Sequence, residues 1–123
     1  MAISYGLKMT WEEFWDSQQN NPWCELFFKY NGKIYVLQQD SFYNNKRNPV
    51  WFIAVSENDS TVLSCDESDA ILGKVFEELA DRYDYDSDDK WKDSMDTCFK
   101  LLNMPLFDGR SFREIIEDID FEY

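Results

Sequence analysis

Histidine is absent from all 123 residues of this chain. Its absence excludes a Ser-His or Cys-His nucleophile, an imidazole general base near neutral pH and a histidine-ligated metal centre. An enzyme would have to work through carboxylates, tyrosine, lysine or a thiol. Paired carboxylates such as Asp88 and Asp93 are present, but no motif fixes their geometry for acid–base chemistry. We therefore expect no catalytic residues and a protein that acts by binding.

Cysteine is scarce as well, since Cys24, Cys65 and Cys98 lie 41 and 33 residues apart without a Cys-x-x-Cys pair. This spacing excludes a zinc knuckle and a local redox motif. The simplest interpretation is three reduced thiols in the core and no cofactor, because free cysteine commonly packs as a small apolar residue. The alternative is a structural zinc ion held by the three thiolates and one Asp, since such ligands need not be local in sequence.

Long apolar runs are also missing. No stretch approaches the ~18 residues of a membrane-spanning helix, and the first nine residues hold no hydrophobic segment of a signal peptide. These absences predict a cytoplasmic protein that does not contact a membrane. With ten Phe, seven Tyr and five Trp, the chain nevertheless has too much to bury for a disordered acidic tail. Its length suits a single domain over residues 1–123.

A short helix is predicted near the start of the chain, from Trp11 to about Gln19. Thr10 and Glu13 have the spacing of a capping box, in which each side chain bonds the free backbone amide of the other residue. The helix ends before Pro22, because the residue before a proline is disfavoured in the helical conformation. Three rings fall at i, i+3 and i+4 on one face, which we assign to the core: Trp11, Phe14 and Trp15.

The dipeptide Asn31-Gly32 separates two apolar runs, over residues 23–30 and 33–39. Both residues tolerate the positive φ angles of a two-residue turn, so the runs are predicted to form an antiparallel hairpin. A third strand is expected at residues 50–56 and a shorter fourth strand at residues 60–65. Four consecutive strands joined in this way predict a meander.

Beyond Cys65 the apolar residues change to a helical period. Their spacing predicts a helix from residue 68 or 69 to about residue 82. A second helix is expected from Trp91 to Leu102, and a third after Ser111, which has the capping-box spacing to Glu114. The predicted fold class is α+β, with an antiparallel four-stranded sheet (meander), an N-terminal helix and three C-terminal helices packed on it.

Basic residues are few, because 25 acidic side chains outnumber 12 basic ones and leave a net charge of −13. Residues 66–123 alone hold 18 acidic and 7 basic side chains, and the densest acidic segment spans residues 81–96. This segment does not match an EF-hand calcium loop, since Asp89 stands where Gly is required and Met95 where a bidentate Glu is required. Two interpretations remain: a solvated helix end that keeps the protein soluble, or a surface that recognises a basic protein.

The recognition interpretation combines carboxylates, which pair with Lys and Arg of a partner, with rings that supply buried contact area. Such a surface resembles nucleic acid electrostatically and speeds association with a basic partner. Direct binding of nucleic acid is disfavoured, because the chain offers no basic stripe for phosphates. The candidate partner-binding residues are Asp84, Tyr85, Asp86, Asp88, Asp89, Trp91 and Asp93.

Three segments carry a resemblance to other proteins. The helix that begins Trp-Glu-Glu-Phe, the hairpin YNGKIY at residues 30–35 and the closing segment PLFDGRSFREI at residues 105–115 resemble small acidic proteins of low-GC Gram-positive bacteria and their mobile elements. Acidic products of such elements are often inhibitors, among them phage anti-CRISPR proteins and the immunity proteins that neutralise a toxin nuclease. The resemblance implies a protein of the host bacterial cytosol.

From size, charge and this resemblance we expect an anti-CRISPR-type inhibitor, which binds a CRISPR effector nuclease through its acidic surface and blocks DNA loading or cleavage. The alternative is an immunity protein that neutralises a cognate toxin nuclease by the same physics. An enzyme and an accessory protein without a direct target are the remaining classes. The expected partner is a basic protein, and the sequence leaves the oligomeric state open.

Overall fold

The structure is a computed structural model that describes residues 4–21, 23, 25–40, 50–56, 71–76 and 88–122, without the side chains of residues 40 and 88–93. These residues form strands and helices in the following order: β1 (Tyr5–Leu7), α1 (Trp11–Asn20), β2 (Glu25–Tyr30), β3 (Lys33–Asp40), β4 (Val50–Val55), β5 (Ile71–Phe76), α2 (Asp88–Leu102), α3 (Phe112–Ile115), the 3-10 helix η2 (Ile116–Asp118) and β6 (Asp120–Glu122).

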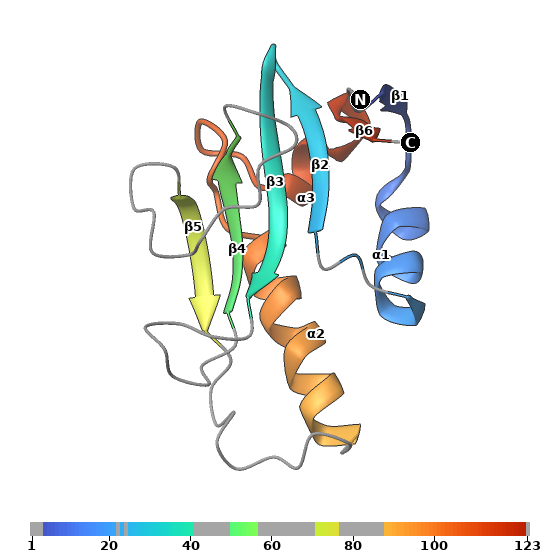
Figure 1. The fold of residues 1–123 in the computed structure, drawn as a ribbon, viewed down its shortest axis with the longest axis vertical. Coiled ribbons are helices and arrows are strands. Elements are labelled where there is room, and N and C mark those ends of the chain that lie inside the picture. The colour runs from blue at the N-terminus through green and yellow to red at the C-terminus, as the bar shows by residue number, and fades with distance from the viewer. Residues whose placement is uncertain are drawn as a thin grey trace.

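The strands form one antiparallel sheet in the order β1-β6-β2-β3-β4-β5 (Figure 1). The predicted α+β class with an antiparallel sheet is confirmed, and β2 to β5 form a four-stranded meander within it. The predicted total of four strands is wrong, because the described sheet has six. The two additional strands, β1 and β6, come from opposite ends of the chain and lie side by side next to β2 (Figure 1).

The predicted hairpin is confirmed as β2 and β3. Their register pairs Tyr30 with Lys33 at the turn and Glu25 with Gln38 at the far end. Asn31 and Gly32 have φ angles of 52° and 79°, the positive values that a type I′ turn requires at both central residues. The right-handed twist of the two strands favours this turn, so the local sequence alone determines the pairing.

The helices pack on one face of the sheet, where α2 and α3 lie behind the strands in Figure 1. Their apolar residues join alternate strand residues in a cluster that we call the helix-side core, which includes Phe14, Phe28, Trp51, Leu101 and Phe112. The opposite face also carries buried side chains: Phe27, Val36, Val50, Phe52 and Ala54. Burial on both faces explains why β4 consists of apolar residues without alternation.

The two predicted capping boxes are present. In α1 the Thr10 hydroxyl accepts from Glu13 N at 3.2 Å, while Glu13 Oε1 accepts from Thr10 N at 3.0 Å. Ser111 and Glu114 make the same reciprocal pair at the start of α3, with distances of 3.2 and 3.0 Å. The predicted bounds of α1 and the prediction of a helix ending at Leu102 are confirmed to within a few residues.

The predicted helix from residue 68 or 69 to 82 is wrong where the structure describes it, because residues 71–76 form strand β5. β5 pairs with β4, with Trp51 opposite Val75 and Ile53 opposite Gly73. Gly73 is a poor helix former and Val75 a good strand former. Pairing with the edge of β4 therefore favours the strand conformation of residues 71–76 over the helical one. The predicted fourth strand at residues 60–65 lies outside the described residues.

The predicted last helix is shorter than expected. Four residues of α-helix and one turn of 3-10 helix are followed by strand β6. The apolar spacing places Ile119 on the helix, but this residue has extended φ and ψ angles of −86° and 139°. The chain leaves the helix here because Phe121 pairs opposite Phe28 of β2, an interaction between residues 93 positions apart that no local pattern reveals.

Candidate protein-binding surface

Three aromatic side chains and one arginine meet where the three α-helices converge, and we call this group the aromatic cluster. Trp11 and Trp15 of α1 stack with ring centroids 5.4 Å apart and an interplanar angle of 9°. Phe99 of α2 lies 6.1 Å from the Trp11 ring and 5.3 Å from the Trp15 ring. The Arg113 guanidinium of α3 lies over the Trp11 and Phe99 rings, with Cζ 4.9 and 5.8 Å from their centroids.

The aromatic cluster is only partly buried. Phe99 keeps 38% of its surface exposed, and the two tryptophans are half-buried against the helix-side core. Phe14, which lies between them in the sequence, is completely buried. The prediction that all three α1 rings belong to the core therefore holds fully only for Phe14, since the spacing i, i+4 places Trp11 and Trp15 at the edge of the buried face.

Arg113 is held in the cluster by ring contacts alone. Within the described residues its guanidinium has no hydrogen bond or ion pair, although Glu114 and Glu117 are close in sequence. A guanidinium over two rings gains about 0.5–1 kcal/mol per exposed contact. Its N–H donors therefore stay available to an acceptor on another molecule, in an orientation that the two rings restrict.

The helices that carry the aromatic cluster, together with η2, also carry exposed carboxylates. Residues 11–20, 94–102 and 112–118 carry seven acidic and two basic side chains. All seven acidic side chains are exposed, and we call them the acidic rim: Glu12, Glu13, Asp16, Asp96, Glu114, Glu117 and Asp118. Because exposed charges within a Debye length act together, the cluster lies in a negative field.

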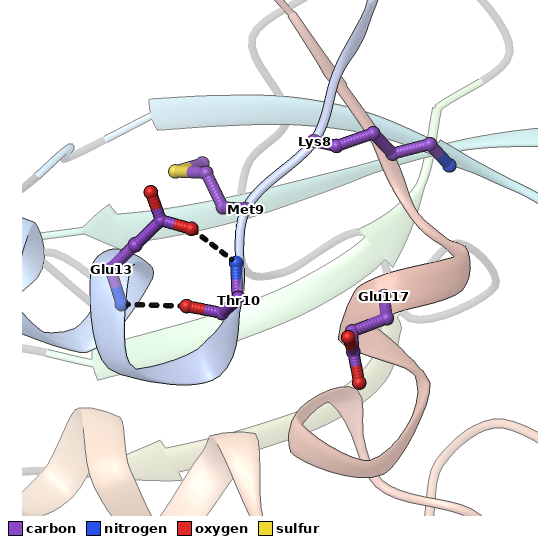
Figure 2. Close-up of a pocket in the computed structure, with 5 residues that line it drawn as sticks. All are labelled: Lys8, Met9, Thr10, Glu13 and Glu117. Atoms are coloured by element: carbon purple, nitrogen blue, oxygen red, sulfur yellow. Dashed lines mark hydrogen bonds between the residues drawn. The ribbon is translucent and has the colours of Figure 1, made fainter.

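A shallow recess of about 260 Å³ opens between the start of α1 and η2, lined by Lys8, Met9, Thr10, Glu13 and Glu117 (Figure 2). Lys8 extends away from Glu13 and forms an ion pair with Asp120 at 2.8 Å. Thr10 and Glu13 are bonded to each other in the capping box, while Glu117 lies across the recess from them (Figure 2). The recess extends the acidic rim and brings no nucleophile and base together.

The sequence-predicted binding residues lie at the edge of what the structure describes. Asp84, Tyr85 and Asp86 fall outside the described residues. Asp88, Asp89, Trp91 and Asp93 lie in the first two turns of α2, where the backbone alone is described. Their place on α2 is informative, because the same helix continues to Asp96 of the acidic rim and Phe99 of the aromatic cluster. The predicted acidic segment and the aromatic cluster therefore share one helix.

Cys98 is a buried structural thiol. Burial raises its pKa to about 12, against a smaller opposing effect from the Gln18 side chain, whose Nε2 donates to Cys98 Sγ at 3.7 Å. At that pKa the thiolate, which is the nucleophilic and metal-binding form, is scarce at neutral pH. Cys24 and Cys65 lie outside the described residues, and the residues that the structure does describe hold no group of three metal-ligating side chains. The zinc alternative stays a prediction.

No protein-family model, curated protein or solved structure matches this chain. Among the described residues, no helix is both long enough and apolar enough to cross a membrane. The aromatic cluster is not among the sequence-predicted sites, although a signal is available: Trp11 and Trp15 one turn apart, with acidic residues directly after each. The sequence does not predict that Phe99 and Arg113 contact these two tryptophans.

Proposed function

We propose that this chain is an inhibitor that binds a basic protein surface, of the kind a nuclease uses to hold nucleic acid, and blocks DNA loading or cleavage. A CRISPR effector nuclease is the first target to test. The observation that supports the proposal is the acidic rim of seven exposed carboxylates on α1, α2, α3 and η2, together with the partly exposed rings that α1 and α2 carry. Charge alone would also keep the protein soluble, but exposed rings within the charged area favour recognition.

Each component contributes a different part of the binding free energy. Trp, Tyr and Arg are the residue types that most often carry binding hot spots, because they bury large areas in well-packed, desolvated pockets. Carboxylates around them steer a basic partner and raise its association rate, an effect that salt weakens. A charge of −13 on 123 residues also repels nucleic acid. The protein therefore binds the nuclease in competition with DNA, and does not bind the DNA itself.

The test is a DNA-cleavage assay with the purified nuclease and increasing amounts of the protein. In the first variant the five Asp residues among the candidate partner-binding residues become lysine: Asp84, Asp86, Asp88, Asp89 and Asp93. In the matched control the same change is made at five acidic residues elsewhere: Asp40, Glu57, Asp59, Asp66 and Glu67. Both variants change the net charge by +10, so they differ only in where the charge lies.

We expect the first variant to lose inhibition at least tenfold and the control to lose less than threefold. Inhibition that is unchanged in the first variant contradicts the role of the predicted acidic segment in binding the nuclease. Equal losses in both variants show that net charge, and not a located surface, inhibits the enzyme. If the protein inhibits a toxin nuclease but no CRISPR effector, the immunity-protein alternative replaces the anti-CRISPR proposal.

A further inference from the structure

Among the described residues three large apolar side chains are conspicuously exposed: Leu7, Phe76 and Phe99. Phe99 stands in a group of rings, since Trp11 and Trp15 lie beside it. Folding explains the position of Trp11 and Trp15, which pack against the helix-side core. It does not explain why three aromatic side chains from two helices gather at one place and leave apolar surface in water.

We infer that the aromatic cluster is the anchor point of the interface, where a basic segment of the partner protein places an apolar side chain against Phe99 and the two tryptophans. Arg113 donates hydrogen bonds to a backbone carbonyl oxygen of that segment, and the acidic rim pairs with its Lys and Arg side chains. The inference rests on the proposed function for the basic character of the partner. It adds the location of the contact and the chemistry on both sides.

The role of Arg113 follows from its surroundings. The Trp11 and Phe99 rings support the guanidinium from one side at 4.9 and 5.8 Å, so part of its conformational entropy is already lost in the free protein. Its donors have no acceptor within the described chain. A planar guanidinium with five N–H groups in fixed directions recognises an oxygen acceptor with defined geometry, which a lysine ammonium does not reproduce.

Charge complementarity decides among the possible occupants. Seven acidic and two basic side chains on the helices around the cluster disfavour an acidic segment. A second copy of this chain would bring another net charge of −13 to the same place, and two like-charged surfaces repel each other when they approach. A basic segment gains from both features, since its apolar side chain covers the rings while its cations neutralise the rim.

The experiment uses three short unstructured peptides as probes, whose backbone carbonyl oxygens are free to accept: a peptide of arginine and leucine, and versions with lysine or glutamate in place of arginine. Calorimetry measures the affinity of each peptide for the protein. The NMR signals of the indole N–H groups of the five tryptophans, assigned by single Trp→Phe variants, show where the peptide binds. Phe99→Ala is compared with Phe76→Ala, which removes the same side chain at nearly equal exposure, 38% against 39%. Thermal unfolding of each variant shows that it folds.

We expect the arginine peptide to shift the Trp11 and Trp15 signals and the glutamate peptide to leave them unchanged. Phe99→Ala should weaken binding of the arginine peptide at least tenfold, and Phe76→Ala should weaken it less than twofold. Arg113→Lys, which keeps the charge, should weaken it about threefold to tenfold, because it removes the planar donor group.

Three results overturn the inference: no binding of either basic peptide, equal affinities for Phe99→Ala and Phe76→Ala, or a dimer that dissociates on Phe99→Ala. The nuclease assay reports independently on the proposed function. If charge reversal at the five Asp residues abolishes inhibition while Phe99→Ala inhibits normally, the inhibitor function stands and the aromatic anchor is wrong. If the basic peptides bind as expected but no nuclease is inhibited, the docking chemistry stands and the target is wrong.

Discussion

Gly73 offers a direct test of strand β5, because a methyl group added there would meet a neighbouring side chain. A Cβ atom at this position would lie 2.7 Å from both Cδ1 and Cδ2 of Leu106. Leu106 follows α2 and is half-buried over β5. Had the segment formed the helix that its apolar spacing predicts, the same substitution would only have replaced a poor helix former with the best one.

The two structures predict opposite signs for Gly73→Ala. In a helix the change stabilises the protein by about 0.5–1 kcal/mol. In β5 the same backbone gain is opposed by about 1–1.5 kcal/mol for moving the end of the Leu106 side chain off its preferred rotamer, since contacts under 3.0 Å cannot persist. We expect a net loss of roughly 0.5 kcal/mol. That corresponds to a fall of roughly 2 °C in the unfolding midpoint for a chain of this size.

The decisive measurement is a double-mutant cycle with Leu106→Ala, in which the free energy of unfolding comes from urea denaturation. Leu106→Ala removes the two methyl groups that the new Cβ atom would meet, so Gly73→Ala in that background should stabilise the protein by about 0.5 kcal/mol. The coupling between the two sites should then be about 1 kcal/mol. Additive effects would refute the packing of β5 against Leu106.

Three further predictions concern single side chains. Ser94→Ala should lower the free energy of unfolding by about 1–3 kcal/mol, measured by urea denaturation, because Ser94 Oγ accepts from the buried Trp51 Nε1 at 3.1 Å; an effect below about 0.5 kcal/mol would contradict it. Burial raises the pKa of Glu122, whose Oε1 accepts from Phe27 N at 3.1 Å, so its folded state binds a proton more readily than the unfolded state. Stability should therefore fall as pH rises through this pKa, and Glu122→Gln should reduce that fall in unfolding curves recorded from about pH 4 to pH 7; an unchanged pH slope would count against it. Cys98, with its pKa raised to about 12 by burial, should resist iodoacetamide in the native protein and react after unfolding, as followed by peptide mass mapping; rapid native labelling would refute its burial.

Local signals in the sequence are sufficient for some elements. The capping boxes at Thr10 and Ser111 and the turn at Asn31-Gly32 each depend on residues within four positions of one another. Their geometry is therefore encoded where they occur, and the structure reproduces them. The same reasoning explains why the helix that ends at Leu102 is predictable, since its apolar residues repeat over four turns.

Non-local pairing determines the elements that the sequence does not predict. β5 has apolar residues that fit both a helix and a strand, and the free edge of β4 decides between them. β6 is only three residues long and lies between β1 and β2, so its existence depends on bringing both ends of the chain together. Short strands of this kind carry too few residues for a period to be recognised.

The aromatic cluster shows the same limit within one helix. The spacing of Trp11, Phe14 and Trp15 gives a shared face, but not which of the three rings the core covers. That depends on where α2, α3 and β6 pack, because Phe112 and Phe121 close over Phe14 whereas Phe99 and Arg113 meet the tryptophans near the surface. A face assigned to the core from periodicity is therefore also the place to look for a binding surface. The discriminating observation is the next layer of side chains, which belongs to two helices and a strand some 85 to 110 residues further along the chain.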